Sequence, residues 1–285
     1  MQGMSEDPKP RLGAIRAVTF AVPDIGAVSE AYVSALGYQL LDDAPLAADT
    51  AARWGASGLA GRPMRTLGPV SGEAVLLRFV TQHELPMVPA LTSHGWNATE
   101  IVVQDVDALA ARLDAHTAFT IIGPPKGLTR FPMIRAMQVI GPVGECLYFT
   151  EVGPGSGLSL APALSFVGRV FIVVAGGGDI DAMFATYAGF DNAVDPPVAT
   201  PVGVISAANQ LPLDTPVLHG LIKLSEGTMI ELDGYPSCTR PRPSLPGLLP
   251  PGMAMVSFDC PAAPPEDRLL VGAAGERIEL LETNA

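Results

Sequence analysis

A strand ending that recurs four times constrains the fold of this chain more than any other sequence feature. Each copy is a glycine followed by a short, mostly apolar run, at positions 72–77, 144–149, 227–232 and 275–280. The third and fourth copies also carry a glutamate four residues after the glycine, Glu231 and Glu279. Because a segment that recurs along a chain marks a repeated supersecondary unit, we expect four such units.

The segments before these endings predict the rest of each unit. Small and β-branched residues at 14–22 favour a strand, and Asp24 is a typical N-cap for an amphipathic helix that ends at Gly37. With strands at 38–41, 64–67 and 74–80, the order of the first unit is βαβββ. The second and third units repeat this order, with helices from Asp105 and Asp179 and strands at 98–103, 119–122, 136–140, 146–152, 169–174, 218–224 and 228–232. The fourth unit has strands at 253–258 and 277–281, but prolines stand where its helix would run, so we predict that this helix is lost.

Composition limits the classes of protein that fit. The 285 residues suit two domains rather than one small core, and 48% hydrophobic with 16% charged residues is typical of a globular chain. The formal net charge of -12 argues against a nucleic-acid or membrane partner. The N-terminus lacks the apolar segment of a signal peptide, and no apolar run is long enough to span a bilayer, so we expect a cytoplasmic protein.

The opening Val22-Pro23-Asp24 with Leu36-Gly37-Tyr38, and the ending Gly-x-x-Ile-Glu-Leu, resemble the units of the vicinal oxygen chelate superfamily. This group includes glyoxalase I, bleomycin-resistance proteins and extradiol dioxygenases. The resemblance covers residues 13–283 and implies an α+β fold, in which four tandem βαβββ modules form two half-open, eight-stranded, barrel-like domains. The expected bounds are a tail at 1–12, an N-terminal domain at 13–153 (modules 13–83 and 94–153), a linker at 154–164 and a C-terminal domain at 165–285 (modules 165–233 and 252–285). The resemblance also implies a small-molecule ligand and is compatible with a homodimer.

Metal-dependent members of this superfamily bind a divalent ion through the first strand of each unit and the glutamate of its last strand. Counting seven residues back from the helix-capping Asp, or aligning the run RVFIVV in the third unit, gives the corresponding positions here. They are Ala17, Leu76, Ala98 and Tyr148 in the first domain, and Arg169, Glu231, Gly252 and Glu279 in the second. This set lacks the expected two histidines and a carboxylate, and a guanidinium opposes a cation. We therefore expect no catalytic metal and no other cofactor.

The first cavity is then the expected functional site. Strand alternation predicts that Arg78, Glu100 and Tyr148 face it. Glu100 would act as acid or base, with Tyr148 and Arg78 as electrostatic partners; the alternative is a simple ion pair between Arg78 and Glu100. Trp54 lies in a glycine-rich loop that is either a mobile lid or a packed turn. The expected substrate contacts are Ala17, Thr19, Trp54, Leu76, Ala98, Cys146 and, in the second domain, Arg169.

The second cavity offers a charged cluster. Arg169, Glu231, Arg277 and Glu279 are expected to share a face, either as ion pairs that fill a disused pocket or as an arginine clamp for a substrate carboxylate. His219 is the histidine in a strand of this domain, so His219, Glu231 and Glu279 are the fallback metal ligands.

Three functional interpretations follow. The first is a metal-independent superfamily member that binds or acts on a small, rather apolar molecule, aromatic ones included, by acid–base chemistry if it is catalytic. The second is a non-enzymatic ligand-binding or resistance protein. The third is a metal-dependent extradiol dioxygenase or a glyoxalase-type enzyme, which has the support of architecture alone.

Overall fold

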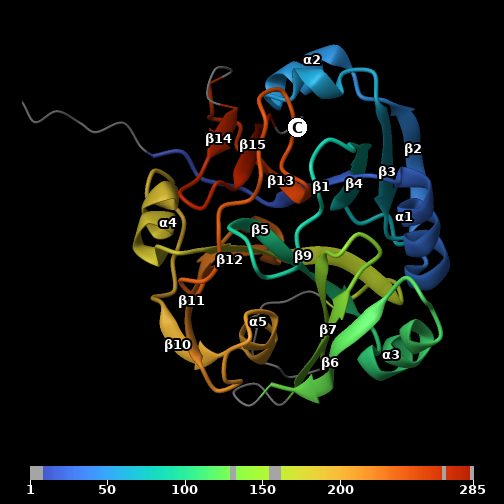
Figure 1. Cartoon of the computed structure of the whole chain (residues 1–285), viewed down its shortest axis with the longest axis vertical. Helices are drawn as coiled ribbons and strands as arrows, with labels where there is room; N and C mark the ends of the chain where they lie inside the picture. Colours follow the sequence, from blue (N-terminus) through green and yellow to red (C-terminus); the bar gives the residue numbers. More distant parts are fainter. Residues whose placement is uncertain (1–8, 129–132, 154–161, 265–267, 283–285) are drawn as a thin grey trace, which may run out of the picture.

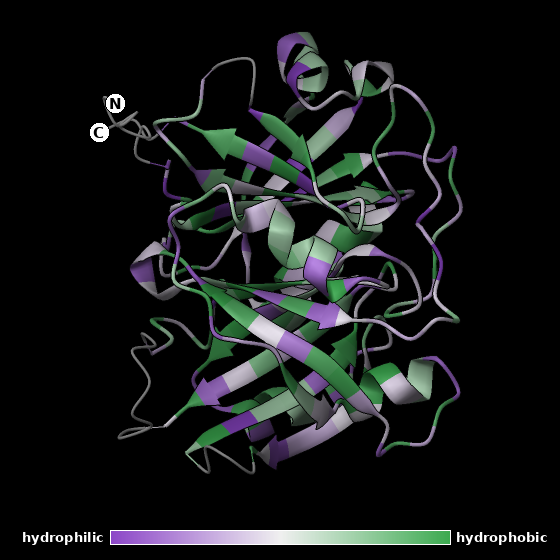
Figure 2. Cartoon of the chain, turned by 90° about the vertical axis from the view of Figure 1, so that its left-hand side faces the viewer, coloured by the Kyte–Doolittle hydropathy of each residue, from purple (hydrophilic) through white to green (hydrophobic). Residues whose placement is uncertain are grey.

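The computed structural model describes residues 9–128, 133–153, 162–264 and 268–282, and these residues form two curved β-sheets (Figure 1). The first sheet has seven strands in the order β14-β15-β13-β1-β4-β3-β2, and the second has eight in the order β10-β11-β12-β9-β5-β8-β7-β6. Figure 2 shows one sheet above the other, with apolar residues on the strands of both. The α+β fold with repeated modules is therefore confirmed, although the first sheet contains seven described strands rather than eight.

The strands of the first sheet come from both ends of the chain. They are β1 (Ile15–Val22), β2 (Gln39–Pro45), β3 (Pro63–Gly68), β4 (Leu76–Thr81), β13 (Gly252–Asp259), β14 (Leu269–Val271) and β15 (Arg277–Leu281). The strands of the second sheet come from the middle. They are β5 (Gly95–Val103), β6 (Thr120–Gly127), β7 (Ile134–Ile140), β8 (Cys146–Val152), β9 (Val167–Gly177), β10 (Val198–Pro201), β11 (Pro216–Lys223) and β12 (Met229–Gly234).

The modules therefore pair differently from the expected order along the chain. The first module joins the fourth through antiparallel β1 and β13, and the second joins the third through antiparallel β5 and β9. The first strand of a module is buried on both faces and needs a neighbour on each side: β1 lies between β4 and β13. One neighbour is the last strand of the same module, and the other is the first strand of a second module. Any module can supply that second strand, so the strand pattern does not show which modules pair. Most of the linker expected at 154–164 lies outside the described residues.

The helices begin where the sequence places their caps. Asp24, Asp105 and Asp179 each accept a hydrogen bond from the backbone N–H three residues later, which satisfies a free donor at the helix start. Gly37 ends the first helical segment with φ of 74°, a conformation that favours glycine. The helical segments are α1 (Ile25–Ala31), the π-helical η1 (Tyr32–Leu36), α2 (Ala48–Arg53), η2 (Ser57–Leu59), α3 (Val106–Asp114), α4 (Ile180–Tyr187), α5 (Gly203–Ala208) and η3 (Ser225–Gly227). In the fourth module, no helix occurs among the residues described between β13 and β14.

Three apolar clusters hold the molecule together. The largest combines residues of both sheets with α1, α3 and α4, and includes the stacked rings of Phe20 and Phe79, whose centroids are 5.2 Å apart. Each sheet also has a separate cluster on its other face, which we call its inner face. The segment from α2 to η2 fills the inner face of the first sheet, whereas α5 packs on that of the second (Figure 1). None of the helices in the described part of the chain has the length and apolar character needed to cross a membrane.

Candidate functional site

A cluster of ionisable side chains lies on the inner face of the second sheet. Glu231 and Asp233 are two residues apart on β12, so they point to the same side. His219 on β11 stands directly opposite Asp233 in the antiparallel pair. Candidate ligand atoms of His219, Glu231 and Asp233 all lie within 4.8 Å of one another, and Nδ1 of His219 is 3.8 Å from Oε1 of Glu231. We call these three residues the His219 cluster.

A hydrogen bond from a neighbouring strand holds the imidazole in place. Nε2 of His219 lies 2.7 Å from Oγ1 of Thr200 on β10. With that nitrogen engaged, Nδ1 is the nitrogen that faces Glu231. Pairing of one ring nitrogen with a polar neighbour is how proteins orient a metal-binding histidine.

Glu100 adds a third carboxylate beside this cluster. It lies on β5 opposite Tyr148 of β8, and its Oε2 accepts a hydrogen bond of 3.3 Å from Oγ1 of Thr150. The negative charge of Glu231 raises the cost of ionising Glu100. The predicted neighbourhood of Glu100 and Tyr148 is thus present in the second sheet.

The protonation of these carboxyl groups is strongly perturbed. Burial, with repulsion from Glu231, raises the pKa of Glu100 to about 8. Burial raises the pKa of Glu231 to about 7, and burial together with Glu231 raises that of Asp233 well above its usual range. The pKa of His219 is lowered by burial, which favours the neutral imidazole. The side chains of His219 and Glu231 nevertheless keep 24% and 21% exposure, so solutes can reach them.

No cationic side chain compensates these carboxylates within the described residues. Neither Lys nor Arg forms an ion pair with Glu100, Glu231 or Asp233 there. Oδ1 of Asp233 and the hydroxyl of Tyr235 are also buried without a hydrogen-bond partner in that part of the chain. Asp233 and Glu231 are also joined by a side-chain hydrogen bond, in which a protonated Asp233 donates. Buried polar atoms are normally paired, so the unpartnered atoms are free to accept or donate a further hydrogen bond.

The equivalent glutamate of the first sheet has a different environment. Oε2 of Glu279 lies 3.1 Å from Nη1 of Arg78 and accepts a hydrogen bond from Ser257. Its Oε1 accepts a bond of 2.7 Å from Nε1 of Trp54, a side chain with 1% exposure. Both carboxylate oxygens of Glu279 are bonded, so this inner face is closed by packing and ion pairing.

These contacts correct several expectations. Arg78 pairs with Glu279, not Glu100, because the two belong to different sheets. Trp54 is a buried filling residue rather than a mobile lid, since α2 carries it into the apolar cluster of the first sheet. Glu279 cannot join His219 and Glu231 as a ligand, because Glu279 lies in the first sheet and the other two lie in the second. Asp233 occupies the place that the fallback set gave to Glu279.

Arg169 also lies elsewhere. Asp179 caps α4, so a count of seven residues back gives Ile172 as the first-strand position of the third module, not Arg169. The guanidinium of Arg169 lies 3.7 Å from Glu73 and donates to the Glu226 carbonyl. Arg277 donates to two backbone carbonyls and forms no ion pair within the described residues.

The remaining expected contact residues divide between the sheets. Ala17, Thr19 and Leu76 belong to the first sheet, where Ala17 pairs with Leu76 and Thr19 with Arg78. Ala98 and Cys146 are paired neighbours in the apolar cluster that surrounds the His219 cluster. Gly252 begins β13 in the first sheet and offers no ligand atom. Asp233 could have been identified from the sequence. The repeated ending stops at Leu232, but the strand continues to Gly234, and strand alternation places residue 233 on the same face as Glu231.

The structural comparisons agree with this architecture. Glyoxalase I from Zea mays is similar over 94% of this chain and 91% of its own, with a TM-score of 0.60 at 12% identity. A proposed dioxygenase from Bacillus subtilis is similar over 95% of this chain and 85% of its own, also with a TM-score of 0.60 at 12% identity. In sequence, neither a protein-family model nor a curated protein matches the chain. The chain therefore has the fold of the vicinal oxygen chelate superfamily, and at this identity the comparisons show the fold alone.

Proposed function

We propose that this protein of the vicinal oxygen chelate fold binds a divalent cation at the His219 cluster and a small molecule beside it. The observation that carries the proposal is the group of three carboxylates and an imidazole without a cationic partner among the described residues. Burial of uncompensated charge is costly, and proteins offset it by pairing or by metal coordination. The expectation of a metal-free protein, drawn from the superfamily positions alone, is set aside here.

The donor set fits such a cation. One imidazole nitrogen with two carboxylates suits Mn²⁺, Fe²⁺ or Zn²⁺, and Oδ1 of Asp233 has no other partner in the described chain. Only Glu231 stands at a position that the superfamily resemblance implied. A cation bound there would act as a Lewis acid toward an oxygen of the ligand.

The chain's own groups would then divide the remaining work. Thr200 fixes the orientation of His219 through Nε2. Without the cation, burial and Glu231 raise the pKa of Glu100 to about 8. A cation bound to Glu231 would lower that pKa again, so Glu100 would take up and release a proton beside the ligand. Tyr148 stands next to Glu100 and can donate a hydrogen bond to a developing negative charge.

The surroundings favour a small ligand with apolar surface. Ala98, Cys146, Ile172 and Val174 belong to the apolar cluster on the same inner face. The helix α5 lies next to the second sheet (Figure 1). Its residues pack against that cluster, and Ile205 is buried in it. A ligand would therefore meet polar atoms at the His219 cluster and apolar side chains around them, as is usual in small-molecule sites.

A second candidate is metal-independent binding or acid–base chemistry by the same residues. The raised pKa values of Glu100 and Glu231 support it, because protonated, uncharged carboxyl groups can lie side by side without a cation. This candidate keeps the Glu100 and Tyr148 roles expected from the sequence and omits the metal.

Calorimetric titration with MnCl₂ and ZnCl₂ tests the proposal. We expect one saturable site per chain in the wild type and at least tenfold weaker binding in Asp233→Asn, which preserves the size of the side chain. Asp195→Asn is the matched control, because Asp195 is an exposed partner of Lys223. Absence of binding by the wild type, or equal affinity in the two variants, would leave only the metal-independent candidate.

A further inference from the structure

A separate hollow of about 250 Å³ lies where the two sheets meet. It is bounded by the starts of β5, β13 and β15 and by the proline-rich connector that follows β12. The side chains that the argument uses are His94, Trp96, Arg242, Val271, Glu276 and Arg277. Apart from Arg277, which the sequence placed in a cluster with Glu231, none of these residues figured in the site expected from the sequence.

Two arginines face this hollow without a carboxylate partner in the described part of the chain. Arg242 donates to the Trp96 carbonyl at 2.8 Å, to the Met253 carbonyl at 2.7 Å and to Oγ of Ser93 at 3.1 Å. Arg277 donates to the carbonyls of Trp54 and Leu248, at 2.8 and 3.1 Å. Carbonyl oxygens orient a guanidinium but do not neutralise it, so two positive charges remain at one pocket.

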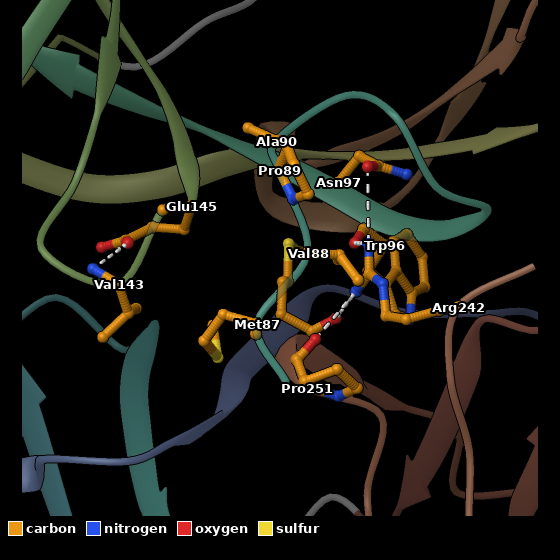
Figure 3. A pocket seen from close by; sticks show the side chains of 13 residues that line it. Met87, Val88, Pro89, Ala90, Trp96, Asn97, Val143, Glu145, Arg242 and Pro251 are labelled. Carbon is orange, nitrogen blue, oxygen red and sulfur yellow. Dashed lines mark hydrogen bonds between the residues drawn. The ribbon is translucent and has the colours of Figure 1, made fainter. Parts of the chain in front are cut away.

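Figure 3 shows how the first of these arginines is held. The Arg242 side chain lies beside Trp96, with dashed bonds toward the Pro251 carbonyl and the side-chain oxygen of Asn97. This view looks into a much smaller neighbouring hollow that shares Trp96, Arg242 and Met253 with the larger one. The contacts tie the connector to β5 and β13 and use all five N–H donors of Arg242. Arg242 therefore has a fixed position and offers the pocket a positive charge rather than free donors.

Burial makes these charges costly. It lowers the pKa of Arg242 to about 10 and also lowers that of Arg277. Two of the five N–H donors of Arg277 are used by the Trp54 and Leu248 carbonyls, which leaves three for another partner. An anion in the hollow would supply both the missing counter-charge and acceptors for these donors.

The acidic and basic neighbours are compatible with an anion. Glu276 is buried, but its carboxylate accepts from the Ala274 N–H at 2.9 Å and from the Tyr187 hydroxyl at 3.4 Å. Burial raises the pKa of Glu276, which reduces its opposing charge. Nε2 of His94 lies 3.0 Å from Oγ1 of Thr239, and its pKa is lowered by burial and by Arg240.

We propose that this hollow, which we call the Arg242 pocket, binds a small organic anion, a carboxylate or phosphate ester with an apolar body. The anionic group would accept hydrogen bonds from Arg277, with Arg242 as a second positive charge in the lining, and the apolar body would lie against Val271 at the rim, in front of the buried Trp96 and Met253. The volume is just below the range of about 300–1,000 Å³ that is usual for ligand pockets, so the ligand is small. The proposal does not depend on the function of the His219 cluster.

Titration with benzoate and phenyl phosphate, followed by calorimetry and by tryptophan fluorescence, tests the Arg242 pocket. Inorganic phosphate tests the anionic group alone, and benzamide is the neutral analogue of benzoate. We expect saturable binding of at least one organic anion, with a fluorescence change from Trp96, and at least tenfold weaker binding of benzamide. Equal binding of benzoate and benzamide, or no binding of either organic anion, would overturn the proposal.

Variants at the rim separate the site from the fold. Val271 is 63% exposed, so Val271→Asp places a negative charge at the pocket with little effect on packing. We expect Val271→Asp to weaken anion binding about tenfold, and Val271→Asn to change it much less. Val70, which is 61% exposed and lies outside the pocket, provides the control Val70→Asp. Equal affinity of Val271→Asp and Val70→Asp would contradict the assignment to this pocket.

Discussion

Glu231 and Glu279 occupy equivalent places in the two sheets, but their neighbours differ in charge. Each lies on the last strand of a module, opposite the first strand of that module, Val174 for Glu231 and Ser257 for Glu279. Glu279 is paired with Arg78 and bonded to Ser257 and Trp54. Glu231 has carboxylates and a histidine around it instead. The same strand ending therefore gives a structural ion pair in one sheet and a candidate ligand in the other.

The segments that cover the two inner faces account for part of the difference. The α2–η2 segment brings Trp54 into the first sheet, where its indole N–H completes the bonding of Glu279. The corresponding α5 contributes Ile205, Val204 and Ala208, which cannot donate a side-chain hydrogen bond to Glu231. The covering segment therefore supplies a hydrogen bond to the glutamate of the first sheet, whereas the apolar residues of α5 supply none to Glu231.

The largest effect is expected from Arg78→Met. Loss of the guanidinium leaves Glu279 buried without its counter-charge, which we expect to lower the free energy of unfolding by roughly 3–5 kcal/mol. Glu231→Gln removes an uncompensated charge and should change stability far less at pH 7. Urea unfolding of both variants measures the difference. Similar losses in the two would contradict the division between a paired and an unpaired glutamate.

Stability of the cation-free protein should depend on pH through the second sheet. Glu100, Glu231 and Asp233 have folded pKa values raised above their unfolded values, so the folded state holds extra protons. Their contribution is fully present below about pH 4.5 and is lost as pH rises to about 8. We expect a decrease of a few kcal/mol, moderated by partial exposure of the site. Urea midpoints from pH 5 to 9 check this, and Glu100→Gln with Glu231→Gln should make the profile less steep. Asp233, Glu145 and Glu276, whose pKa values burial also raises, account for the slope that remains.

The two buried tryptophans provide a matched pair. Trp54 donates Nε1–H to the carboxylate of Glu279, and Trp96 donates to the backbone carbonyl of Arg277, both at 2.7 Å. A bond to a charged group contributes about 1.5–3 kcal/mol and a neutral one about 1 kcal/mol. Trp54→Phe should therefore cost about 1 kcal/mol more than Trp96→Phe in thermal or urea unfolding. Equal costs would mean that the charge of Glu279 adds nothing to its bond with Trp54.

A further prediction concerns Thr200, whose effect should fall on cation binding and not on stability. Thr200→Val removes the hydroxyl that orients His219, and we expect Mn²⁺ binding to weaken by about tenfold with little change in folding. Calorimetry gives the affinity, and circular dichroism confirms that the fold is kept. If affinity is unchanged, the imidazole does not need this neighbour to reach its position.

The sequence was most informative about local structure. The glycine endings, the capping aspartates and the strand alternation led to the modules and to the fold, since each rests on neighbouring residues. Glu231 and His219 were identified as candidates in the same way. The pairing of modules was not readable, because every first strand is apolar enough to accept any other as its neighbour.

The unknown pairing of the modules explains most of the errors in the predicted site. Placing the first module beside the second joined Arg78 to Glu100, and placing the third beside the fourth joined Glu279 to Glu231. The helix α5 and strand β10, which carries Thr200, lie in a stretch with no clear periodic pattern, so they were not expected. Asp233 was missed although it follows Glu231 by two residues on the same strand.

The most direct test of the account is anomalous diffraction from crystals grown with Mn²⁺. We predict one strong peak per chain between β11 and β12, within coordination distance of Nδ1 of His219 and of the carboxylates of Glu231 and Asp233. The inner face of the first sheet should show none, because Glu279 is already bonded to Arg78, Ser257 and Trp54. A peak beside Glu279, or no peak at the His219 cluster at saturating Mn²⁺, would contradict the distinction between the two sheets.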